Sequence, residues 1–213
     1  MYGIYTEEEL QKFRDGSDPY GYPNTDWNKE VLLPRAWQQM HSLTASGGSD
    51  KVKYFAGFGY VKQDALYGDT RTNKSTSGFN RYNARVNIDA NIVDKYLNLS
   101  ADMAYRQEDR NSIAGSTSDV FNNMHRNPQT DPGRFPDGNL GKVSLGVNPI
   151  GLATEGGWVK DRKSVLNTRF MLDFNVPGLE GLNLKGIFSY DKIFNSIKRW
   201  TTPVDFYVWN KIT

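Results

Sequence analysis

Residues 79–106 read FNRYNARVNIDANIVDKYLNLSADMAYR, and this stretch decides the fold class. Every second residue from Tyr82 to Ile92 is apolar or aromatic, and the residues between them are asparagine, arginine or aspartate. A similar alternation resumes at Leu97 and continues to Tyr105. Because side chains along a strand point to opposite faces in turn, the pattern predicts a β-hairpin with one uncharged face and one polar face.

The two predicted strands are long. Each contains about ten residues or more, whereas strands of soluble sheets usually contain about five or six. A tilted strand of about 9–11 residues is long enough to cross the hydrocarbon core of a bilayer. The length therefore raises the question of whether lipid or a protein core covers the uncharged face.

Composition argues against several classes of protein. The chain has 26 basic and 24 acidic residues among 213, so its charge gives no electrostatic basis for binding nucleic acid. Mean hydropathy is −0.65, and no run approaches the roughly 18 apolar residues of a transmembrane helix. Barrel strands are compatible with such a value because they alternate apolar and polar residues. The lack of cysteine removes disulfides, thiolate metal sites and cysteine nucleophiles.

The N-terminal part of the chain does not alternate. Thr6 and Glu9 have the spacing of a capping box, which predicts a short helix that ends at Gly16. Thr25 or Asp26 is placed to cap a second short helix. The first residues lack the basic and apolar regions of a secretory signal, so no signal peptide is expected in this chain.

Alternating segments continue through the chain at residues 38–46, 51–62, 164–176 and 182–193, on either side of the hairpin. The predicted connections are short at 47–50, 93–95 and 177–181 and long at 63–78 and 107–163. Outer-membrane barrels have this alternation of tight turns and long loops, and tyrosines near strand ends fit their interfacial girdle. These features favour a transmembrane barrel over a soluble β-sandwich, which also shows period two.

The longest predicted connection, at about 107–162, contains several turn signals and a short helix beginning near Ser118. Loops of this length are usually functional or disordered. Because aromatic faces stack on sugar rings and other flat surfaces, Phe121, Phe135 and Trp158 are candidate contacts for a substrate or a lid. Packing within the loop is nevertheless the more common role of such residues.

Short segments spread over the chain resemble SusC/RagA-type TonB-linked outer-membrane transporters. The similar segments are KFRDGS at 12–17, YPNTDW at 22–27, QQ at 38–39, HSL at 41–43, SGGS at 46–49, VKYF at 52–55, YVKQD at 60–64, FNRY at 79–82, PDG at 136–138 and NP at 148–149. They occur in the family's order and cover essentially the whole chain. The passage from YPNTDW to SGGS is the most specific.

The resemblance implies an all-β fold, namely a partial antiparallel transmembrane β-barrel. Members of the family are several times longer and enclose a plug in a barrel of about 22 strands. If this chain follows that plan, residues 1–37 are a short helical or loop segment that connects the plug to the barrel. Residues 38–213 then supply about six N-terminal strands, with a long extracellular loop at about 107–162. The implied location is the outer membrane of a Gram-negative bacterium, in contact with its lipid.

The resemblance also implies energised import of oligosaccharides or oligopeptides. A SusD-like surface lipoprotein would present the substrate, and the TonB complex would act through an N-terminal box that this sequence lacks. The polar face would line the lumen or contact the plug, and static contacts with the plug are favoured over substrate contacts. The residues expected to do so are Lys53, Arg81, Arg85, Asp89, Asp102, Arg106, Arg169 and Asp173.

Two other functions have less support. A soluble β-rich glycan-binding module would bury the uncharged face in a core. An enzyme would need a nucleophile and a base, but the only histidines, His41 and His125, have no serine or acidic partner at a telling spacing. The two histidines also lack the spacing of a metal site. We therefore expect no catalysis, cofactor or bound metal.

Overall fold

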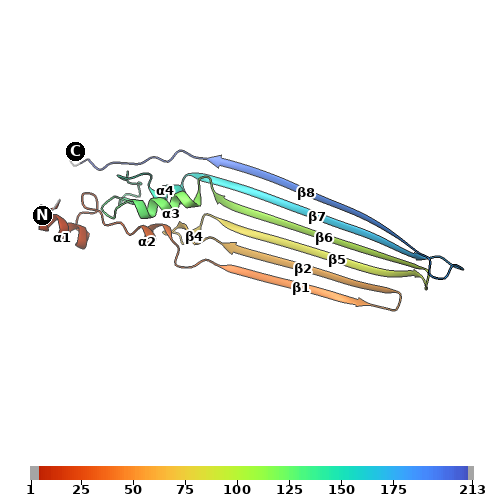
Figure 1. Ribbon diagram of the computed structural model, residues 1–213. Coiled ribbons are helices and arrows are strands. Elements are labelled where there is room, and N and C mark those ends of the chain that lie inside the picture. Colours follow the sequence, from red (N-terminus) through yellow and green to blue (C-terminus); the bar gives the residue numbers. More distant parts are fainter. Residues whose placement is uncertain (1–4, 211–213) are drawn as a thin grey trace.

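Six long strands form one antiparallel sheet in the computed structural model, which describes residues 5–210 (Figure 1). The strands are β1 (Gln38–Gly48), β2 (Val52–Asp64), β5 (Gly78–Val93), β6 (Leu97–Ile113), β7 (Gly157–Asn175) and β8 (Asn183–Thr201). They lie side by side in chain order, and each pairs with the next. The predicted all-β fold is therefore confirmed, with the open sheet that a part of a barrel would have.

Helices and a small hairpin gather at one end of the sheet, and the short turns lie at the other end (Figure 1). These elements are α1 (Glu7–Asp15), α2 (Trp27–Val31), α3 (Thr117–Arg126), α4 (Pro149–Thr154), β3 (Gly68–Asp69) and β4 (Lys74–Ser75). We call the end with the helices the loop end and the opposite end the turn end. Because β1 starts at the loop end, residues 5–37 lie there as well (Figure 1).

The strands are longer than the alternation predicts. The connection expected at 107–162 is confined to residues 114–156, because β6 continues to Ile113 and β7 begins at Gly157. At the loop end of β6, Gln107 and Asp109 lie on the same side of the strand as Tyr105, but they are polar. Both sides of the strand are therefore polar there, and the alternation disappears. Sequence periodicity detects a strand only where its two faces differ in polarity.

The predicted helix caps at the N-terminus are confirmed. The Thr6 hydroxyl accepts from the Glu9 amide at 3.3 Å, and the Glu9 carboxylate accepts from the Thr6 amide at 2.8 Å. That backbone hydrogen bond to the charged form lowers the pKa of Glu9. Gly16 ends α1 with a φ of 67°, a left-handed conformation that suits glycine. Asp26 is the cap of α2, and the cap of α3 is Ser116, two residues before the expected position.

The described part of the chain has its hydrophobic core at the loop end, outside the sheet. The core contains Trp27, Val31, Tyr67, Ile113, Val120, Met124, Leu140, Val143, Ile150 and Ala153. These residues come from α2, α3 and α4, from the two long connections and from the last residue of β6, Ile113. The Trp27 indole also donates to the Pro128 carbonyl at 3.2 Å. The N-terminal segment and the 114–156 connection therefore share one core.

Thr25 joins these two segments through a buried hydroxyl. The hydroxyl donates to the Asp131 carbonyl at 2.6 Å and accepts from the Gly133 amide at 3.0 Å. The Thr25 amide donates to the Gln129 carbonyl at 2.8 Å. A capping role is open to either Thr25 or Asp26 from sequence, but Asp26 caps the helix and Thr25 bridges to residues about a hundred positions away.

Among residues 5–210, none of the helices is long and apolar enough to cross a membrane. The expected lack of a signal peptide concerns residues 1–4, which lie outside the described part of the chain. Residues 211–213, at the end of the predicted barrel region, lie outside it too.

Substitution of Thr25 by valine tests the link between the two segments. Valine keeps the shape but leaves the buried Gly133 amide and Asp131 carbonyl without this partner, which costs roughly 1–3 kcal/mol. We expect faster amide hydrogen exchange at residues 131–135. Thr130→Val is the matched control, because Thr130 is exposed. Equal exchange in the two variants would contradict the bridging role of Thr25.

Candidate functional site: the polar face of the sheet

The strand register places side chains of opposite chemistry on the two faces of the sheet. Val86 on β5 is paired with Ala56 on β2 and Met103 on β6, whereas Asn87 is paired with Phe55 and Asp102. We call the face with Val86 the apolar face and the face with Asn87 the polar face. A register shift occurs only between Asn91 and Val93, next to a turn, so the two faces persist through the ladder from β2 to β8.

All eight residues predicted to line a lumen or contact a plug lie on the polar face. Their positions differ by even steps along each strand, and the register connects them across β2, β5, β6 and β7. The set is Lys53, Arg81, Arg85, Asp89, Asp102, Arg106, Arg169 and Asp173. Their contact with a plug or a lumen stays a prediction.

Asp102 is the centre of a row of three paired residues. Both Arg169 Nε and Nη2 donate to Asp102 Oδ2, at 3.0 and 2.6 Å, and Asn87 donates to Asp102 Oδ1. The three residues are direct register partners on β5, β6 and β7. Such cross-strand pairs stabilise a sheet and fix side-chain direction. Asn87 was not among the predicted site residues, since only the register reveals its position beside Asp102.

Two further pairs lie nearer the turn end of the polar face. Asp89 accepts from the Ser100 hydroxyl at 2.6 Å. Lys185 Nζ lies 3.4 Å from the Asp173 carboxylate, which also accepts from Asn183. Each of these acidic groups is therefore held by a neighbouring strand, which limits the directions in which it can interact with another molecule.

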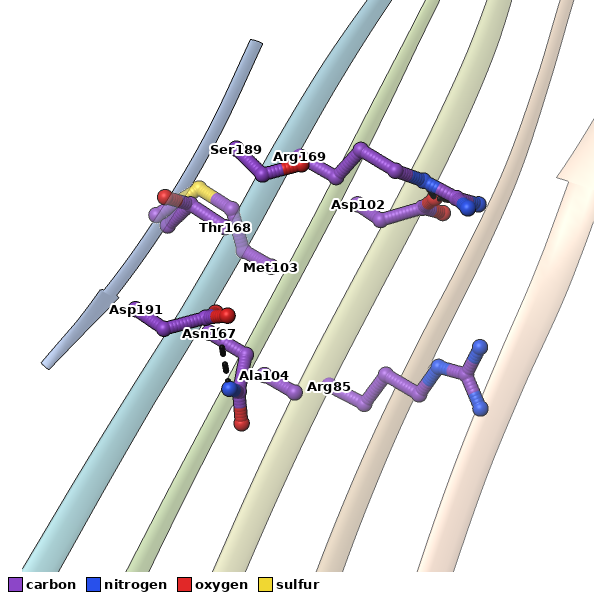
Figure 2. A pocket seen from close by; sticks show the side chains of 9 residues that line it. All are labelled: Arg85, Asp102, Met103, Ala104, Asn167, Thr168, Arg169, Ser189 and Asp191. Atoms are coloured by element: carbon purple, nitrogen blue, oxygen red, sulfur yellow. Dashed lines mark hydrogen bonds and ion pairs between the residues drawn. The ribbon is translucent and has the colours of Figure 1, made fainter. Parts of the chain in front are cut away.

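A shallow hollow of about 350 Å³ lies over the middle of the polar face (Figure 2). Its lining includes Arg85, Asp102, Ala104, Asn167, Arg169, Ser189 and Asp191. Asn167 donates to Asp191 at 2.8 Å, and the Arg85 side chain extends away from that pair (Figure 2). Asp191 and Asn167 were not predicted as site residues, although their alternation along β7 and β8 carries the signal.

The three aromatic residues predicted in the long loop do not form one site. Trp158 lies on β7, paired with Ile113 and Trp200. Its predicted place in a loop is wrong, because β7 begins at Gly157, before the alternation becomes visible in the sequence. Phe135 is only 6% exposed and stacks on Tyr20 at a ring distance of 5.6 Å. Phe121 is on α3 and packs edge-on against Tyr67. Phe121 and Phe135 therefore have packing contacts, and a role in binding substrate stays a prediction.

Aromatic rings line the apolar face near its loop end. His41, Tyr60 and Tyr82 are register partners on three successive strands, with ring distances of 6.2 and 5.1 Å. One row nearer the turn end, the Tyr105 hydroxyl hydrogen-bonds with Ser164 at 3.2 Å.

The two histidines lie far apart in the fold. His41 has a ring contact with Tyr60 on the sheet, whereas His125 lies in the last turn of α3. Among the described residues, no group of three or more histidine, aspartate or glutamate side chains could hold a metal ion.

Comparisons with known proteins give matches at the level of structure. One solved structure is the RagAB peptide importer in the 'open-open' state, with a TM-score of 0.64, 16% identity, and coverage of 95% of this chain and 25% of that chain. Another is the RagAB peptide transporter, with a TM-score of 0.59, 17% identity, and coverage of 88% and 23%. No protein-family model and no curated protein matches the sequence.

The chain thus spans about a quarter of the length of the solved chains that it matches. At this identity, the similarity shows the fold alone. It agrees with the fold that the sequence segments imply, and it gives no information about individual side chains.

A double-mutant cycle on Asp102 and Arg169 tests whether the polar face is open in this chain. Their side chains are 30% and 59% exposed, so Asp102→Asn combined with Arg169→Gln should give a coupling energy of about 0.2–1 kcal/mol. The measurement is urea unfolding of the chain folded in detergent. The exposed pair of Arg162 and Asp109 is the control. A coupling above about 3 kcal/mol would show that another element buries the first pair.

Proposed function

We propose that the chain forms part of the wall of an outer-membrane β-barrel transporter that imports oligopeptides or oligosaccharides. The observation that carries this proposal is the apolar face, which no other element covers within residues 5–210. Exposed side chains on it include Phe58 (49%), Met103 (46%), Leu172 (44%) and Phe188 (62%). A continuous apolar surface of this kind marks a binding partner or a membrane.

The height of the uncharged part of this face suits a bilayer. On β2 it runs from Val52 to Tyr60, and Lys62 follows at the next position on that face. Nine residues at about 3.3 Å each give roughly 30 Å along the strand. A strand tilt of about 40° reduces this to roughly 23 Å of height, close to the ~25 Å apolar band of an outer-membrane barrel. The rings of His41, Tyr60 and Tyr82 then lie at its loop-end border, where such barrels have aromatic girdles.

One cation on the apolar face is compatible with this arrangement. Lys192 is paired with Leu166, one row from the loop-end border, and its ammonium lies 4.8 Å from the centre of the Phe194 ring. A long lysine side chain near the border can reach the headgroup region while its methylene groups stay in apolar surroundings.

The alternative of a soluble glycan-binding module has less support. A β-sandwich covers its apolar face with a second sheet, and the described residues contain one large sheet and a small hairpin with two residues in each strand. An enzymatic function has no supporting observation, since His41 stacks on Tyr60 and His125 is distant along the chain on α3.

The wider transport system is proposed from the resemblance to SusC/RagA-type transporters. It includes a SusD-like lipoprotein and energy supplied through the TonB complex. If the short turns face the periplasm, as in other outer-membrane barrels, the loop end faces outward. Residues 5–37 would then lie outside with the 114–156 connection (Figure 1). We therefore propose that they belong to an outer cap, in place of the plug-to-barrel connection expected from the resemblance.

A matched pair of lysine substitutions on β5 tests the membrane assignment. Val86 and Asn87 are adjacent and lie near the middle of the apolar and polar faces. In lipid vesicles, Val86→Lys should lower the free energy of unfolding by roughly 2–4 kcal/mol, because it places a charge at the bilayer midplane. Asn87→Lys should cost about 1 kcal/mol or less, because the new cation lies opposite Asp102.

Equal effects of the two substitutions would contradict a lipid-facing surface. Fractionation and circular dichroism of the wild-type chain give an independent test. We expect aggregation in buffer and a gain of β-structure in detergent. A monodisperse monomer that unfolds cooperatively in plain buffer would show that the apolar face is covered by protein, and the transport proposal would be wrong.

A further inference from the structure

The charges on the polar face are distributed unevenly between its two ends. A row here means the residues that are register partners across the strands. In the turn-end half, which runs from the row of Asp102 to the turns, the charged residues are the basic residues Lys53, Arg169 and Lys185 and the acidic residues Asp89, Asp102 and Asp173. Three cations therefore balance three anions. Two of the anions have ion pairs within 3.4 Å, and Asp89 accepts from Ser100. This half is neutralised by its own residues.

The loop-end half has an excess of cations. From the row of Arg85 to the row of Phe79, its basic residues are Arg81, Arg85, Arg106, Arg110 and Lys163, and its acidic residues are Glu108, Asp161 and Asp191. Five cations against three anions leave an excess of two positive charges. We call Arg81, Arg85 and Arg106, which lie on β5 and β6, the basic strip.

Register places the three members of the basic strip close together. Arg106 is the partner of Asn83, which lies between Arg81 and Arg85 on the polar face of β5. Arg106 is thus a diagonal neighbour of both, at about 7–8 Å. Its one carboxylate neighbour is Glu108, at 3.4 Å. Like charges at this spacing repel one another and favour binding of an anion.

Neither Arg81 nor Arg85 makes an ion pair within the described part of the chain. Glu108, the register partner of Arg81, instead pairs with Arg106, and Asp102, a diagonal neighbour of Arg85, pairs with Arg169. The Arg81 Nε atom is buried and has no hydrogen-bond partner. Arg85 lies between Gly57 and Ala104, neither of which has a polar side chain, and it extends away from Asp191 (Figure 2). The Phe55 ring lies over Gly57, 3.2 Å from where a Cβ would be, and it provides an apolar surface beside the Arg85 row.

We propose that the basic strip binds acidic peptides, through carboxylate groups paired with Arg81 and Arg85. Planar guanidinium groups suit carboxylates because they can donate two parallel hydrogen bonds. The strip lies in the half of the polar face nearer the loop end, where a substrate would enter. This inference rests on the proposed function, since it places the polar face inside a transporter, and it specifies the chemistry of the substrate.

The test uses the full chain folded in detergent micelles, with a fluorescently labelled hexapeptide of alternating glycine and glutamate whose ends are blocked. Fluorescence anisotropy measures its Kd. We expect saturable binding that weakens as salt rises, and no comparable binding of the peptide with glutamine in place of glutamate. Arg81→Gln with Arg85→Gln should raise Kd by at least about tenfold, because both charge-assisted hydrogen-bonding groups for the peptide carboxylates are lost.

The matched control removes the same charge from the turn-end half, by Lys53→Gln with Lys185→Gln. We expect its Kd to stay within about twofold of wild type, because these lysines lie beside Asp89 and Asp173 in the register. Circular dichroism checks that each variant keeps its strands. If the arginine double variant loses its β-structure, Arg85→Gln alone replaces it, because the Arg85 side chain makes no hydrogen bond or ion pair among the described residues.

Several results would overturn the inference. One is an equal loss of affinity in both double variants, and another is equal binding of the glutamine peptide. The others are tighter binding of the anionic glycan oligogalacturonate and no binding of the acidic peptide by a folded chain. In each case the membrane assignment would stand, because the lysine substitutions on β5 test it separately. A chain that gains no β-structure in detergent would overturn the proposed function and this inference together.

Discussion

A single antiparallel hydrogen-bond register, continuous from β1 to β8, determines where the side chains of the sheet lie. Because strands alternate with a period of two, a shift of one residue in any strand would exchange its two faces. The observed shift between Asn91 and Val93 lies beside a turn, where it disturbs neither face. The apolar belt, the aromatic border and the rows of paired charges all follow from this register.

The sheet has an unusual relation to the hydrophobic core. In most domains, a sheet buries one face against another layer. Here the buried residues of the described chain gather at the loop end, and Phe58, Met103 and Phe188 remain exposed on the apolar face. Burial of apolar surface is worth about 25 cal/mol per Å², so the surroundings of the sheet contribute strongly to its stability. Whatever covers the apolar face is therefore part of what stabilises the fold.

The polar face combines two kinds of charged surface. Toward the turn end, cross-strand partners such as Asp102 and Arg169 neutralise each other and hold each other in place. Toward the loop end, arginines outnumber carboxylates, and Arg81 keeps a buried donor without a partner. A wall of this kind is rigid and neutral at one end and attracts anions at the other. In the proposed transporter, such a gradient suits a surface along which an acidic substrate enters from the loop end.

The sequence by itself determined the elements whose signals are local. The alternation at 79–106 predicted two paired strands, and the spacing of Thr6, Glu9 and Gly16 predicted a helix with both of its ends. It also placed all eight predicted polar residues on one face, because alternation needs no knowledge of the partner strand. Trp158 was placed in a loop because β7 begins in a segment whose two faces do not differ in polarity, so alternation gives no signal there.

Only the tertiary structure decided which residues meet across strands and between segments distant in sequence. The pairing of Asn87 with Asp102 depends on register, and the bridge from Thr25 to Asp131 and Gly133 joins parts of the chain about a hundred residues apart. Neither contact leaves a periodic signal in the sequence. Period and capping act over a few residues, whereas register and long-range hydrogen bonds are properties of the assembled chain.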